Sequence, residues 1–144
     1  MRVPSVEEED RRRLIRERDS LLAARQRGLN RIKGLLYLHG IFDLQPKARD
    51  LIPRLLDTPT GYGEPFPPHT LAQIGRIKDN LNQINEHIAI VEAQRDAMVK
   101  AGTEADPGTV EKMAATLTQV RGIGTNDATL LATEVFSRDF QNRR

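Results

Sequence analysis

The 144-residue chain carries a formal net charge of +2, with 38% hydrophobic and only 4% aromatic residues. So few rings argue against a large compact core and predict helices that share a narrow apolar seam. The absence of cysteine excludes disulfide bonds and thiolate metal sites, and an intracellular protein is the simplest expectation. No apolar run approaches the ~20 residues of a transmembrane helix, and no signal peptide is recognisable, so we expect no membrane partner.

Positive charge gathers near the start of the chain. From Arg11 to Lys33 there are nine basic residues against two acidic ones, Glu17 and Asp19. This local excess of positive charge could neutralise a phosphate backbone. The alternative is a solvated helix face on which Glu17 and Asp19 pair with some of the arginines. On the first interpretation, the candidate nucleic-acid contacts are Arg25, Arg27, Arg31 and Lys33.

The first predicted helix runs from about Ser5 to Ile41. Ser5 can cap it, and its apolar residues recur with a period of about seven. We expect a bend near Gly28, because glycine lowers helix propensity. A short helix follows from Pro46 to about Leu56, and a Pro/Gly-rich tip spans 57–68.

The third predicted helix, from about His69 to Ala101, carries the strongest structural pattern. Eight positions alternate spacings of three and four, and seven of them are apolar. This is the pattern of a coiled coil, whose seam must be covered by the first helix or by a second copy of the chain. Arg95 occupies the eighth position and favours an antiparallel arrangement. The apolar seam residues are Ile74, Ile77, Leu81, Ile84, Ile88, Val91 and Met98.

After a loop at 102–108, the chain has the pattern of a helix-hairpin-helix. Two helices, about Thr109–Val120 and Asn126–Ser137, flank a Gly-Ile-Gly turn. Such turns let backbone amides approach a DNA phosphate closely. Ile123 is the expected apolar pin between the helices, Ala128 permits a close crossing, and Leu117, Val120 and Leu131 are expected on the inner faces. The candidate DNA-binding residues are Arg121, Gly122, Ile123, Gly124, Thr125 and Asn126. The alternative is an ordinary tight turn between packed helices.

No catalytic constellation can be assembled from this sequence. The three histidines are scattered without metal-ligand spacing, and the acidic run at 7–10 suits the first turn of a helix. We therefore expect no catalytic residue, no metal ligand and no cofactor in this chain. An enzyme would need clustered titratable groups, and the sequence offers none.

Two stretches resemble a known family. Residues 4–41, above all NRIKGLL at 30–36, resemble the long helix that follows the nuclease-like domain in transposases of the IS-one-ten insertion-sequence family (IS-one-sixteen/IS-nine-oh-two). The stretch VRGIGTNDATLLATEVFSRDFQNRR, 120–144, resembles the hairpin that opens that family's C-terminal transposase domain. The resemblance implies an acidic, divalent-metal-binding RuvC-like domain before Met1 and a serine nucleophile after Arg144. It also implies a structured guide RNA as a partner.

These observations predict an all-α protein, a long antiparallel helical hairpin or coiled coil followed by a helix-hairpin-helix. The predicted domains are a coiled-coil region at 1–101 and, at 109–144, the truncated start of a transposase domain. The predicted function is DNA binding, with structured RNA as a further candidate ligand, and self-association into a homo-oligomer during DNA transposition. As a fragment, the chain is expected to be inactive alone, cytoplasmic, and nucleoid-associated when bound to DNA. The alternative function is that of a stand-alone coiled-coil adaptor without nucleic-acid binding.

Overall fold

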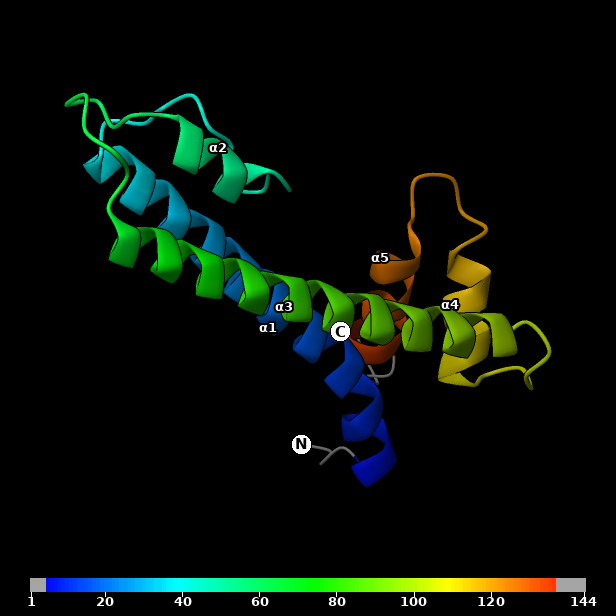
Figure 1. The fold of residues 1–144 in the computed structure, drawn as a ribbon. Helices are drawn as coiled ribbons and strands as arrows, with labels where there is room; N and C mark the ends of the chain where they lie inside the picture. The colour runs from blue at the N-terminus through cyan, green and yellow to red at the C-terminus, as the bar shows by residue number, and fades with distance from the viewer. Residues whose placement is uncertain (1–4, 137–144) are drawn as a thin grey trace, which may run out of the picture. The chain divides into compact units, whose positions relative to one another are not determined.

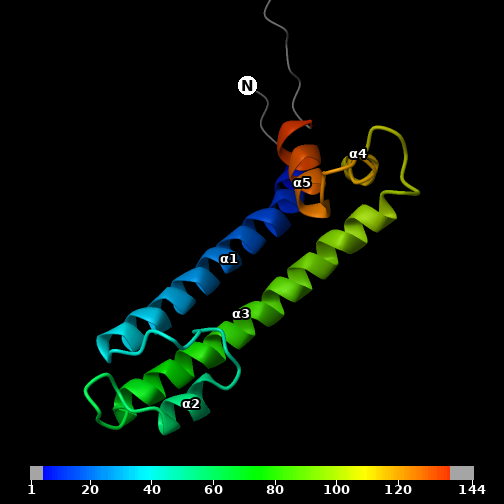
Figure 2. The same ribbon diagram turned by 90° about the horizontal axis from the view of Figure 1, so that it is seen from above.

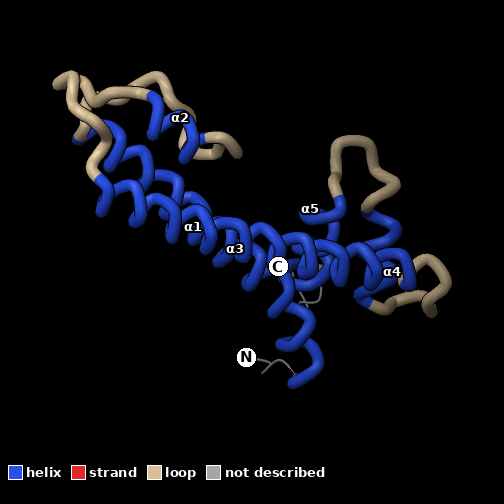
Figure 3. Tube along the Cα trace, in the orientation of Figure 1, coloured by secondary structure: helices blue, strands red, loops and turns tan. Residues whose placement is uncertain are grey.

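The computed structural model describes residues 5–136 and confirms the all-α prediction, because no strand occurs among them. The order of elements follows the predicted one (Figures 1 and 3). The predicted helix end at Ser137 and the last residues of the chain lie outside the described range. No helix in that range is both long and apolar enough to cross a membrane. The elements are α1 (Val6–Leu38), α2 (Leu51–Asp57), α3 (Pro68–Ala101), α4 (Val110–Leu117), α5 (Thr125–Leu130) and a π-helical turn, η1 (Leu131–Val135).

The chain forms two compact units, and each takes a part of both long helices. The first unit combines the residues up to Ser20 with those from Ile88 onward, and the second is Leu21–His87. The predicted division into a coiled-coil region at 1–101 and the start of a transposase domain at 109–144 stays a prediction.

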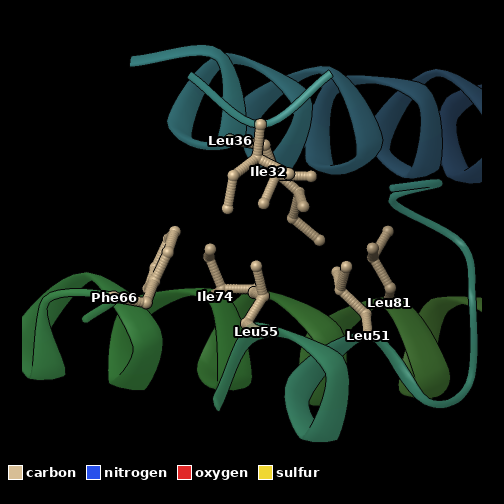
Figure 4. Packing of buried hydrophobic residues seen from close by; sticks show 8 residues of the cluster. Ile32, Leu36, Leu51, Leu55, Phe66, Ile74 and Leu81 are labelled. Atoms are coloured by element: carbon tan, nitrogen blue, oxygen red, sulfur yellow. The ribbon is translucent and has the colours of Figure 1, made fainter. Parts of the chain in front are cut away.

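In the second unit, the later half of α1 and the first half of α3 lie side by side and run in opposite directions (Figure 2). Their apolar faces meet the side chains of α2 in one core (Figure 4). Leu51 and Leu55 of α2 are fully buried there, so the short helix closes this core. The buried core residues are Ile32, Leu36, Ile41, Leu51, Leu55, Phe66, Ile74 and Leu81.

The helix α1 continues through Gly28, as predicted, and the bend near Gly28 stays a prediction. A Cβ at Gly28 would lie 2.8 Å from Cδ2 of Leu81, so glycine permits a close approach of α1 to α3. One sequence expectation for this unit needs correction. The second helix begins at Leu51, later than predicted from Pro46, and it includes Pro53. Pro53 is tolerated because it lies in the first turn, where backbone amides have no partner within the helix.

The first unit contains the start of α1, the end of α3, and α4, α5 and η1. Ser5 caps α1 as predicted: the Glu8 amide donates to Ser5 Oγ at 3.2 Å, and the Ser5 amide donates to Glu8 Oε2 at 2.8 Å. Thr109 caps α4 by accepting the Lys112 amide. The core of this unit is built mostly from small side chains, which bring helices close together: Val99, Ala114, Ala115 and Ala132.

The π-helical turn gives the last described helix a local irregularity. The Phe136 amide donates to the Leu131 carbonyl at 2.9 Å, a five-residue step. Two buried threonines donate their hydroxyls to carbonyls of the preceding turn. The hydroxyl of Thr129 donates to the Thr125 carbonyl, and that of Thr133 donates to the carbonyls of Thr129 and Leu130. Such back-bonding satisfies the buried hydroxyls and tends to bend helices.

The predicted seam of α3 contributes buried positions to both units. Every apolar seam position is buried or half-buried within the single chain. Ile74 and Leu81 belong to the core of the second unit, while Ile88 and Val91 are buried in the first. The seam is therefore already covered in one copy of the chain; a coiled coil between copies stays a prediction.

Candidate nucleic-acid interface

The loop between α4 and α5 forms the turn that the sequence predicted as a helix-hairpin-helix (Figure 3). After α4 ends, the Val120 amide donates to Leu117 and the Ile123 amide donates to Val120, each at 3.1 Å. The chain reverses at Gly122, whose φ of 95° lies in the left-handed region that favours glycine. Gly122 is thus required by the conformation of the turn itself.

Gly124 has a different role. Its φ of −78° and ψ of 166° are extended values that any residue can adopt. A Cβ at this position would meet no atom within 4 Å. The amides of Thr125 and Asn126 have no hydrogen-bond partner among residues 5–136. The protein therefore leaves open space beside unpaired backbone donors.

The other predicted hairpin residues divide between the surface and the interior. Arg121 is exposed and forms no ion pair with the described carboxylates, while Ile123 is half-buried, as a pin between helices would be. Ala128 is fully buried. Val120 does not lie on an inner face: its side chain is 50% exposed, because the turn has already left the axis of α4.

Arg95, the polar residue of the seam, reaches the hairpin. Its guanidinium is buried and donates to Oδ1 of Asp96 at 2.7 and 2.9 Å. It also contacts Oδ1 of Asn126 at 3.5 Å, a distance at the limit of a hydrogen bond. The seam arginine thus approaches the start of α5, and the side chain of Asn126 is turned toward it. Sequence reasoning missed this pairing, because the two residues lie 31 positions apart.

Most arginines at the start of α1 are engaged within the first unit. Arg11 pairs with Glu111 at 2.9 Å and Arg18 with Glu92 at 2.7 Å. Buried Arg12 donates to the Thr133 carbonyl at 3.2 Å, and Arg16 reaches Glu134 at 3.2 Å. The ion-paired interpretation of this segment is therefore correct for these four.

The partners of these arginines are mostly not those expected from the sequence. Arg18 lies 3.9 Å from Asp19, but its shorter pair is with Glu92, and Glu17 pairs with none of them. The acids that hold these arginines come from the start of α1 and from α3, α4 and η1. Only Arg13 in this stretch is exposed without an ion pair to a described carboxylate.

The basic residues of the second unit are arranged differently. None of the candidates Arg25, Arg27, Arg31 and Lys33 forms an ion pair with a carboxylate in the described range. Arg27 and Arg31 are exposed one helical turn apart. Arg25 is half-buried and faces a hollow that it shares with Lys47 and Lys78. The four cannot all contact one groove, because Arg25 and Arg27 lie about 200° apart around the helix axis.

Two aromatic rings lie beside this basic surface. Lys33 Nζ is 5.3 Å from the centroid of the Tyr37 ring, and that ring is 5.0 Å from the ring of Phe42. Tyr37 is 45% exposed and Phe42 64% exposed. No regular interleaving of aromatic and basic residues occurs in the sequence, so this cluster was not predicted. The only signal was that Tyr37 and Phe42 are near each other in the sequence, on either side of the end of α1.

The described residues contain no group of His, Cys, Asp or Glu side chains that could hold a metal ion. The groups left without a carboxylate partner among the described residues include Arg121, Arg27, Arg31 and Lys33, and the Tyr37 ring lies beside Lys33. This arrangement suits the binding of an anionic polymer.

The chain is 44% identical, over 147 residues, to a protein of Sinorhizobium fredii named "Putative transposase y4rJ". The similarity covers 100% of this chain and 37% of that protein. The chain thus spans little more than a third of the length of its curated relative, and its similarity is to a transposase. No protein-family model matches the chain, and no solved structure matches it.

Proposed function

We propose that this chain is a nucleic-acid-binding part of an insertion-sequence transposase of the IS-one-ten family and acts in DNA transposition. The observation that carries the proposal is the turn at 122–124, where open space lies beside the unpaired amides of Thr125 and Asn126. Backbone amides at the start of a helix bind phosphates well, and a DNA backbone supplies phosphates without any requirement for sequence. The similarity to a transposase over the whole chain supports the same assignment.

The hairpin suits a contact that positions the protein on DNA. Exposed Arg121 adds positive charge beside the turn, whereas exposed Asp127 opposes it. The basic row of Arg27 and Arg31 belongs to the same proposal, with structured RNA or DNA as its ligand. The reaction itself belongs to segments of a whole transposase that would carry a divalent metal and a serine nucleophile.

Self-association is a further element of the proposal. Because the seam residues are covered within one chain, a second copy would bind another surface. Exposed apolar side chains suit such a contact, and Ile90 on α3 is 54% exposed.

The test is the affinity of the 144-residue chain for a short DNA duplex at several salt concentrations. The Gly124→Val variant keeps an extended backbone and places a side chain where the phosphate would lie. We expect binding to fall with rising salt and Gly124→Val to weaken it at least about tenfold, the loss expected when one charge-assisted phosphate contact is removed.

The matched control is Gly75→Val in α3, where a side chain also enters open space but no ligand is proposed. Its affinity should equal that of the unmodified chain. Equal binding by Gly124→Val would make the hairpin purely structural. The absence of any salt-dependent binding to DNA or RNA would favour the adaptor function instead.

A further inference from the structure

The second unit contains a hollow of about 420 Å³ whose charged lining is entirely positive. Arg25 of α1, Lys47 of the loop before α2 and Lys78 of α3 all face it, and no carboxylate does. The remaining polar lining is made of side-chain amides, among them Asn82 and Asn85. We propose that this hollow, named here the Arg25–Lys47–Lys78 pocket, binds a phosphate group of a nucleic-acid strand.

One hydrogen bond fixes the architecture of the pocket. Lys78 Nζ donates to the carbonyl oxygen of Ala48 at 2.6 Å, which fastens the loop before α2 to α3. This bond uses one of the three donors of the ammonium group, so the others stay free for a ligand. The neighbouring Lys47 lines the same pocket. The loop, α1 and α3 therefore each contribute one cation to a preformed site.

The electrostatics of the pocket indicate the charge of its ligand. Arg25 is half-buried without an ion pair to any described carboxylate, although buried charges are ordinarily paired. Three like charges around one hollow repel each other, and this repulsion disfavours the folded state. A bound anion removes the repulsion, so its binding should stabilise the fold.

The chemistry of the lining favours a nucleotide phosphate. An arginine can bind two phosphate oxygens at once, and the lysines add point charges. The amides of Asn82 and Asn85 can both donate and accept, as the edge of a base or a sugar hydroxyl requires. This site rests on the proposed nucleic-acid binding and deepens it, but it needs neither the hairpin nor the outward row of Arg27 and Arg31.

The test compares Arg25→Gln and Lys47→Gln with Arg76→Gln, which removes the same charge from an exposed position of α3 that does not line the pocket. The probes are a single-stranded 12-mer oligonucleotide, thymidine monophosphate and inorganic phosphate; affinity and melting temperature are measured. We expect the two pocket variants to weaken oligonucleotide binding at least about tenfold and Arg76→Gln to weaken it less than about threefold. In chloride buffer of low ionic strength, Lys47→Gln should melt slightly higher than the unmodified chain, but the stabilisation by the oligonucleotide should be lost.

Equal losses in all three variants would overturn the pocket, because they would indicate only a general attraction between charges. Saturable binding of thymidine monophosphate or inorganic phosphate as tight as that of the oligonucleotide would overturn the strand as the source of the phosphate. The Gly124→Val variant separates this result from the hairpin proposal. If only Gly124→Val weakens duplex binding, the result supports the hairpin contact and contradicts the pocket. If only the pocket variants weaken oligonucleotide binding, the result supports the pocket and contradicts the hairpin contact.

Discussion

Gly102, in the turn that follows α3, lies directly against the backbone of Glu111 in α4. A Cβ at this position would overlap the carbonyl carbon and oxygen of Glu111 and lie 3.0 Å from its Cα. The obstacle is backbone and not the end of a flexible side chain, so a larger residue could be admitted only by moving α4. Since α4 is the first helix of the hairpin, this contact sets where the hairpin begins.

The Gly102→Ala substitution should therefore destabilise the chain. We expect the free energy of unfolding to fall by about 3 kcal/mol, the upper end of overpacking costs. Gly75→Ala in α3 is the control, because its methyl group enters open space and should raise stability by up to about 1 kcal/mol through helix propensity. Urea unfolding followed by circular dichroism measures both. Equal stabilities would show that α4 does not pack against Gly102.

The docking of α2 gives a second prediction. Leu55 is fully buried in the core of the second unit, whereas the adjacent Leu56 is 68% exposed. Leu55→Ala should lower the free energy of unfolding by about 2–5 kcal/mol, the usual cost of a buried cavity. Leu56→Ala should change it by no more than about 0.5 kcal/mol. Both variants are measured by the same urea titration. Comparable losses of stability would mean that α2 does not pack against the core through Leu55 alone.

The sequence predicted α3 to within one residue, from His69 against the observed Pro68, because its apolar spacing is unbroken. The start of α2 could not be predicted in this way. Pro46 and Pro53 both suit the first turn of a helix. The packing of Leu51 against the core determines that the first turn of α2 contains Pro53 and not Pro46. Local pattern thus decided a long helix, while tertiary packing decided a short one.

The candidate site was less predictable than the fold. The Gly122–Gly124 turn could be located because glycine there has a local cause, the positive φ of Gly122. The state of each arginine could not be predicted, because the acids that pair with Arg12 and Arg16 include Glu134, more than a hundred positions away. A basic sequence therefore indicated charge, but not which charges remain available to a ligand.

Arg12 and Arg13 are adjacent in sequence, but their substitution should have different effects on the free energy of unfolding. Arg12 is buried, donates to the Thr133 carbonyl and lies 3.7 Å from carboxylates of Glu9 and Glu134. Arg12→Ala should lower the free energy of unfolding by about 1–3 kcal/mol, since it removes a charge-assisted hydrogen bond to the carbonyl of buried Thr133. Arg13→Ala should change it by less than about 0.5 kcal/mol.

The two variants also separate structure from binding. Under conditions where both remain folded, Arg12→Ala should keep its affinity for DNA, because its guanidinium is occupied inside the protein. A loss of affinity in a folded Arg12→Ala protein, measured by fluorescence anisotropy, would contradict the assignment of this arginine to the fold.

The burial of the seam makes a last prediction about oligomeric state. Ile74 and Leu81 pack within the core of one chain, so their burial needs no second copy. Association of folded chains raises the melting temperature as concentration rises, whichever surface they use. Self-association through the proposed outer surface needs no seam residue, so we expect any shift between about 2 and 200 μM to be as large in Leu81→Ala as in the unmodified chain. Leu81→Ala should lower the melting temperature equally at both concentrations, because Leu81 is buried in a monomeric core. A rise of several degrees with concentration, abolished by Leu81→Ala, would instead mean that the seam closes between chains, and the seam would then be the surface of self-association.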